Sequence, residues 1–105
     1  MNQNKVLQLL SLAQRAGKIK SGEFMTETSV KEGVATLVIV ALNASDNTKK
    51  KFNDMCSFYN VPIVFYSDKD SLGHFIGKEF RASLAVCDKG FSDNILKLIE
   101  NMETM

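Results

Sequence analysis

The residues that could carry out chemistry are few in this sequence, and they do not form a recognisable catalytic set. The only histidine, His74, lies in a predicted short helix, where a lone histidine is more often a surface residue than a catalytic base. No P-loop, GxGxxG or HExxH motif occurs. The acids on predicted turns and helix faces are Asp46, Asp54, Asp68, Asp70 and Asp88. Helix capping explains acids at such places, so we predict a binding domain without catalytic residues, metal or cofactor.

Two polar features could still belong to a site. Ser45 and Asp46 follow a predicted buried strand, where α/β enzymes often place ligands, although capping of the next helix is the simpler explanation. The two cysteines, Cys56 and Cys87, stand apart from each other without a CxxC pattern. This spacing is typical of buried free thiols rather than of a zinc site.

The segment around Gly22 is the strongest candidate for an anion site. It opens a predicted helix, and the free N–H groups and dipole of a helix N-terminus attract anions. Lys18 and Lys20 lie just before it, and Arg15 is close in the sequence. The alternative is an ordinary helix start with solvated lysines. The run of Lys49 to Lys51 is similarly open, because it can be a solvated helix face or a phosphate contact.

Composition excludes several classes of protein. The chain has 105 residues, 45% of them hydrophobic and 24% charged, with a formal net charge of +1, which is typical of one globular domain. The longest apolar run, residues 34–42, is too short to span a bilayer. The N-terminal residues lack the pattern of a signal peptide, so we expect a cytoplasmic protein with no membrane partner.

The apolar residues change their period repeatedly along the chain, which predicts alternating helices and strands. Helices are expected over residues 6–17, 22–33, 68–77 and 91–102. Another helix is expected after a cap at Ser45 or Asp46, with one apolar face made of Phe52, Met55, Cys56 and Tyr59. Strands are expected over residues 18–21, 34–42, 61–66 and 83–87. This order predicts a mostly parallel or mixed sheet between helical layers. The runs VATLVIVAL and VPIVFY should be buried and central, and the strand at 18–21 should lie at an edge or run antiparallel.

The helix after Gly22 carries two apolar residues that its periodicity does not explain. Thr26, Ser29 and Val30 form its inward stripe, and neither Phe24 nor Met25 shares it. At least one of the two should therefore lie at a rim or at a partner surface, unless the buried face is wider than the stripe.

Four motifs in register resemble the ribosomal-type kink-turn RNA-binding protein family, and within it the bacterial YlxQ group. They are LLSLAQRAGKIKSGE, LNASDNTKKKF, CSFYNVPIVFY and LGHFIGKEFRASLAVCDKGF, which together cover most of the chain. The resemblance implies a single domain over residues 1–105 with an α/β fold. That fold is a three-layer α/β/α sandwich around a four-stranded mixed sheet.

The resemblance also implies a function, the binding of structured, kink-turn RNA, and an association with the ribosome. The RNA contacts that it implies are Lys20, Gly22, Glu23, Phe24, Met25, Thr28, Asn43, Glu79, Phe80, Arg81 and Ala82. The wider family favours an Asn-Glu pair and a downstream Lys where this chain has Phe24, Met25 and Thr28. The alternative function is therefore a protein-interaction module on the same fold, with Phe24 and Met25 in an apolar contact.

Overall fold

The chain folds into alternating helices and strands over residues 2–103, the part that this computed structural model describes. The elements are α1 (Asn2–Arg15), β1 (Ile19–Ser21), α2 (Glu23–Lys31), β2 (Leu37–Val40), α3 (Asp46–Tyr59), β3 (Ile63–Phe65), α4 (Lys69–Phe75), β4 (Ser83–Val86) and α5 (Lys89–Glu103). The domain predicted over residues 1–105 includes Met1, Thr104 and Met105, which lie outside the described residues. Among the helices described, none is both long enough and apolar enough to cross a membrane.

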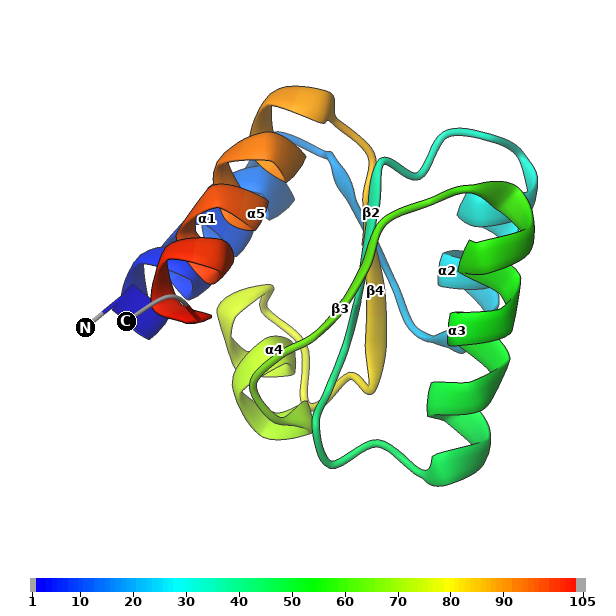
Figure 1. The fold of residues 1–105 in the computed structure, drawn as a ribbon. Helices are drawn as coiled ribbons and strands as arrows, with labels where there is room; N and C mark the ends of the chain where they lie inside the picture. The colour runs from blue at the N-terminus through cyan, green and yellow to red at the C-terminus, as the bar shows by residue number, and fades with distance from the viewer. Residues whose placement is uncertain (1, 104–105) are drawn as a thin grey trace.

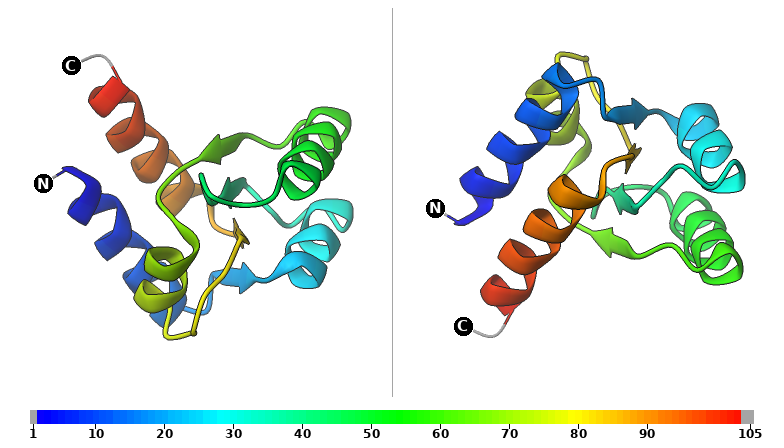
Figure 2. Two further views of the ribbon diagram at one scale, coloured as in Figure 1. Left: turned by 90° about the horizontal axis from the view of Figure 1, so that it is seen from below. Right: turned by 90° about the horizontal axis from the view of Figure 1, so that it is seen from above.

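The strands form one four-stranded sheet in the order β1-β4-β2-β3. β2 and β3 are parallel, whereas β4 runs antiparallel to both β1 and β2. α2 and α3 cover one face of the sheet, and α1, α4 and α5 cover the other (Figure 1). The two further views in Figure 2 show the same separation into layers. The fold is the three-layer α/β/α sandwich with a mixed sheet that was predicted.

β2 and β4 form the centre of the sheet and of the core. Every residue of both strands is buried, because helices cover the two faces and a strand flanks each side. The predicted central position of residues 34–42 is therefore confirmed for the strand at residues 37–40, whereas Val34 and Leu42 at the ends of the run are exposed and that part of the predicted burial is wrong. β1 is an edge strand and pairs antiparallel with β4, which confirms the prediction for residues 18–21.

The predicted central position of residues 61–66 is wrong. β3, the strand in this segment, is an edge of the sheet and pairs with β2. Ile63 and Val64 are only half-buried, and Phe65 is exposed. An apolar, β-branched run indicates a strand whose faces are covered by other elements. It does not specify which strands lie beside it in the sheet. Here β4 occupies the other side of β2, which leaves β3 outermost.

The inward faces of the helices mostly follow the predicted periodicity. Thr26, Ser29 and Val30 of α2 are buried, as expected. On α3, Phe52 is fully buried and its expected neighbour Tyr59 is exposed, so that part of the stripe is wrong. Tyr59 is the last residue of α3, and Asn60 after it ends the helix in a left-handed conformation.

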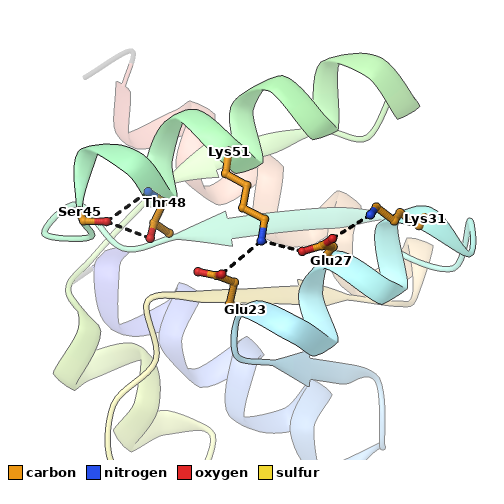
Figure 3. Close-up of polar contacts among 6 residues, drawn as sticks. All are labelled: Glu23, Glu27, Lys31, Ser45, Thr48 and Lys51. Carbon is orange, nitrogen blue, oxygen red and sulfur yellow. Dashed lines mark hydrogen bonds and ion pairs between the residues drawn. The ribbon is translucent and has the colours of Figure 1, made fainter.

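An ion-pair cluster joins α2 to α3 on the outer side of their layer (Figure 3). Lys51 Nζ of α3 lies 2.6 Å from Glu27 Oε1 and 3.2 Å from Glu23 Oε2. Lys31 Nζ lies 2.8 Å from Glu27 Oε2. The hydrogen bonds from Lys31 and then Lys51 lower the pKa of Glu27 to about 2. The two helices are therefore linked by charge as well as by packing.

Two phenylalanines of α3 test the predicted core. Phe52 is fully buried and Phe58 is 78% exposed. Because Phe52→Ala would leave a cavity, it should lower the free energy of unfolding by about 3–5 kcal/mol. Phe58→Ala on the same helix should change it by less than about 0.5 kcal/mol. Urea titrations followed by circular dichroism measure both values, and equal losses would contradict this core.

Acid should weaken the Glu27 cluster within a defined pH range. The pKa of Glu27 is about 2 in the folded protein against its ordinary value of 4.5, so the contribution of its carboxylate to stability is present above pH 4.5 and is lost as the pH falls toward 2. Between pH 5 and pH 3, the free energy of unfolding should therefore fall less for Glu27→Gln than for wild type. Urea titrations at each pH measure this fall. Glu32→Gln, on an exposed residue just after α2, is the control and should follow wild type.

Candidate nucleic-acid interface

Segments that are far apart in the sequence meet at one edge of the sheet. Gly22, after β1, donates its N–H to the Ser83 carbonyl at 2.9 Å. Ala41, after β2, donates its N–H to the Ala82 carbonyl at 2.9 Å. The loop of residues 79–82 therefore enters the sheet between the ends of β1 and β2. The segments around residues 22, 43 and 79–82, which were predicted to act together, are neighbours.

Three helices begin at this edge, and two of them carry their own side-chain caps. Ser45 Oγ accepts the Thr48 N–H at the start of α3, at 3.1 Å. Asp68 Oδ1 accepts the Ser71 N–H at the start of α4, at 2.8 Å. α2 starts at Gly22 without a side-chain cap, so the N–H groups of its first turn have no partner within the helix. Of the three ends, that of α2 is open to an anion.

Gly22 has a backbone conformation that keeps this end open. Its φ of 91° and ψ of 161° lie in a region that is essentially restricted to glycine. A Cβ atom on Gly22 would lie 3.9 Å from Arg81 Nε. A Cβ would therefore meet Arg81 only in ordinary van der Waals contact, and it is the backbone conformation of the turn into α2 that requires glycine.

Arg81 is held beside Gly22 by hydrogen bonds of its own. Its Nε donates to Ser21 Oγ at 3.2 Å and its Nη1 donates to the Phe80 carbonyl at 2.7 Å. Its backbone N–H donates to the Lys69 carbonyl at 3.0 Å. A guanidinium has five N–H donors, so others remain for a ligand. Arg81 thus places a fixed positive charge next to the open end of α2.

The loop of residues 79–82 is positioned by α4. A Cβ on Gly73 would lie 2.5 Å from Phe80 Cα, so only glycine allows the helix and the loop to pack this closely. Asn43 Oδ1 accepts the Lys69 N–H at 2.9 Å and ties the turn after β2 to the start of α4. The side-chain oxygen of Asn43, a predicted RNA contact, therefore also has a structural role.

Exposed apolar side chains surround this basic edge. Phe24 is 76% exposed, Leu42 57% and Phe80 55%. Met25 is also exposed, which confirms that the pair after Gly22 lies at the surface. Lys69 Nζ lies 6.0 Å from the centre of the Phe80 ring, within the range of a cation–π contact. The edge thus offers flat apolar surfaces together with positive charge.

Two predicted contacts lie away from the edge itself. Lys20 neighbours Ser21 in β1, and successive side chains of a strand point to opposite faces. Lys20 therefore projects from the face opposite to the Ser21–Arg81 contact. Thr28 is half-buried and lies about 9 Å along α2 from Gly22 at the usual helical rise. Both residues flank the edge.

The sequence did not identify three residues that belong to this neighbourhood. Lys69 and Leu42 carried no signal, because a single lysine and the end of an apolar run are common. Lys51 was noted only within its basic run, and its position against Glu23 depends on the packing of α2 on α3 (Figure 3). Glu79, the remaining predicted contact, is exposed in the loop.

The site residues do not suggest catalytic chemistry. Within residues 2–103, His, Cys, Asp and Glu do not form a group of three that could hold a metal ion. Burial raises the pKa of Cys56 to about 11 and also raises that of Cys87, so both remain thiols at neutral pH rather than nucleophilic thiolates. His74 is exposed, as predicted.

Comparison with known proteins shows the family to which the chain belongs. Residues 4–96 match the ribosomal protein L7Ae/L30e/S12e/Gadd45 family. The RNA-binding protein YlxQ of Bacillus subtilis is 40% identical over 92 residues, which cover 88% of this chain and 92% of that protein. The large ribosomal subunit protein eL8 of Thermoplasma volcanium is 30% identical over 96 residues, which cover 90% and 79% respectively.

A solved structure, that of a Bacillus halodurans protein of unknown function, superposes with a TM-score of 0.88. It is 40% identical in sequence, and the match covers 91% of this chain and 97% of that one. The two relatives with named functions are RNA-binding and ribosomal proteins rather than enzymes, in agreement with the predicted binding domain. The chain belongs to the ribosomal protein L7Ae/L30e/S12e/Gadd45 family, within which it is similar to the bacterial YlxQ proteins.

Proposed function

We propose that this protein binds structured RNA at the sheet edge formed by Gly22, Asn43 and residues 79–82. The observation that carries the proposal is the open N-terminus of α2 beside Arg81, whose guanidinium is fixed by Ser21 and Phe80. Uncapped N–H groups and a guanidinium are donors for phosphate or base oxygens. The named relatives are an RNA-binding protein and a ribosomal protein, which supports the same ligand class.

The apolar side chains of the edge suit RNA whose bases are unstacked. Structured RNA is usually recognised at loops and bulges, where free bases stack on aromatic rings or guanidinium planes. Phe80, with Lys69 Nζ near its ring, and Arg81 are the residues that we expect to stack. A kink-turn, in which the helix axis bends at an internal loop, presents such bases together with closely spaced phosphates.

Selectivity for kinked over straight RNA should be weaker than is typical of the family. Phe24, Met25 and Thr28 stand where the wider family favours groups that hydrogen-bond to base edges. Phe24 and Met25 are exposed but offer no side-chain hydrogen bond to a guanine. Binding would therefore depend on backbone N–H groups, charge and stacking, which are less specific.

The proposed RNA partner also implies where the protein acts in the cell and with which assembly it associates. Structured RNA such as ribosomal RNA is found in the cytoplasm, so we infer a cytoplasmic, ribosome-associated role for a single domain over residues 1–105. A second candidate function is protein interaction through the apolar part of the edge, which the exposure of Phe24, Leu42 and Phe80 favours.

Titration of two RNAs tests the proposal. One RNA contains a kink-turn, and the other is a continuous duplex of equal length. Gly22→Val should close the end of α2, and Arg81→Ala should remove the fixed charge, so each should weaken binding of the kinked RNA by roughly five- to tenfold. Arg15→Ala removes the same charge from an exposed residue of α1 and is the matched control.

The outcomes separate the candidates. If neither Gly22→Val nor Arg81→Ala changes binding, the RNA site lies elsewhere. If Arg15→Ala weakens binding as much as Arg81→Ala, net charge alone explains the effect. If the wild-type protein binds neither RNA, the protein-interaction function replaces RNA binding. Circular dichroism of each variant shows whether its fold is intact.

A second prediction concerns the loop that carries Phe80. Gly73→Ala would place a Cβ 2.5 Å from Phe80 Cα, so the loop must shift and RNA binding should fall by at least about fivefold. Gly90→Ala, in α5, would meet only the Asp88 carboxylate, at 3.3 Å, and should leave binding unchanged. Fluorescence anisotropy with labelled kinked RNA measures both, and equal affinities would show that the loop does not contribute.

A further inference from the structure

We propose that Lys51 is a positioning residue of the RNA site, which holds and neutralises Glu23 so that the open end of α2 can accept an anion. The inference rests on the proposed function and adds a residue from another helix to it. Glu23 is the first residue of α2, directly after Gly22. Its carboxylate is therefore the negative charge closest in sequence to the N–H groups that would meet RNA.

A free carboxylate at this position would compete with the ligand. Helix N-termini stabilise carboxylates for the same reasons that they stabilise phosphates. Glu23 could therefore turn toward the uncapped N–H groups of its own first turn, and it would also repel a phosphate. In the structure, Glu23 Oε2 instead lies 3.2 Å from Lys51 Nζ, directed toward α3 (Figure 3).

The charges of the cluster balance only when Lys51 is present. Lys31 contacts Glu27, and Lys51 contacts both Glu27 and Glu23. Two lysines therefore neutralise two glutamates. Without Lys51, Glu27 keeps its contact with Lys31, but Glu23 loses the ion pair that it makes in the cluster. One negative charge would then stand beside the open end of α2.

Lys51 is poorly suited to be a direct phosphate contact. Its ammonium lies within ion-pair distance of two carboxylates, and both attractions raise its pKa, with the Glu27 hydrogen bond the largest cause. Transfer of Lys51 to a phosphate would break these contacts and expose Glu23 to the same ligand. Its effect on RNA should therefore act through Glu23.

A double-mutant cycle with the kinked RNA tests this role. Lys51→Met should weaken binding roughly fivefold, the size expected for one unscreened charge several ångströms from the ligand. In a Glu23→Gln background the same substitution should weaken binding less than twofold, because no carboxylate remains to be neutralised. Glu23→Gln alone should bind at least as tightly as wild type, because it keeps the backbone N–H that is expected to meet RNA and removes only the charge of the side chain.

Lys31→Met is the matched control. It removes the same charge from the same cluster and also leaves Glu27 with one lysine. Lys31 is eight residues beyond Glu23, about 12 Å along the helix, so its loss should change RNA affinity less than twofold. Similar melting temperatures for the two lysine variants would show that their structural effects are equal.

Salt dependence separates positioning from direct contact. A lysine that binds a phosphate directly lowers the slope of log affinity against log salt concentration by roughly 0.7–1 unit when it is removed. Lys51→Met should leave the slope within about 0.3 unit of wild type, well below that loss.

The inference is overturned if Lys51→Met does not weaken binding, if Glu23→Gln fails to rescue it, or if Lys31→Met weakens it equally. Each of these results leaves the proposed function intact, provided that the wild-type protein binds RNA. Absence of RNA binding by the wild type would instead refute the proposed function.

Discussion

The structure depends on the insertion of β4 between β1 and β2. β4 is the last of the four strands in the sequence, but it pairs antiparallel with both neighbours in the centre of the sheet. This pairing brings the loop of residues 79–82 to the edge where β1 and β2 end, through the Gly22–Ser83 and Ala41–Ala82 hydrogen bonds. Without it, the opening of α2 and the loop that carries Arg81 would have no common surface.

The charged groups at this edge are held in place by hydrogen bonds and ion pairs to neighbouring residues of the protein. The caps Ser45 and Asp68 each accept an N–H of the first turn of α3 and α4, whereas α2 begins at Gly22 and has no side-chain cap. Arg81 is fixed by hydrogen bonds to neighbouring residues, and Glu23 is held by Lys51. A chain with a formal net charge of only +1 can therefore present a local anion site, because placement matters more than the total charge.

Much of the fold could be predicted from the sequence, because the period of the apolar residues reports which side of each element is buried. The helix end near Gly33, the inward residues of α2 and the buried run of β2 all followed from such local signals. The position of β3 did not, since its apolar residues are compatible with a central or an edge strand. Strand order depends on which distant segments pair, and apolar patterning does not encode it.

For the candidate site, the sequence by itself determined the types of residue: a glycine at a helix start, basic residues near it and two unexplained apolar residues after it. Motif resemblance indicated which segments belong together. Only the tertiary structure decided that Lys20 points away from the Arg81 face, that Asn43 holds the start of α4, and that Lys51 reaches Glu23 across two helices. These contacts and side-chain directions join residues that are distant in the sequence, or they depend on which face of the sheet a helix covers. They exist only once the layers have packed.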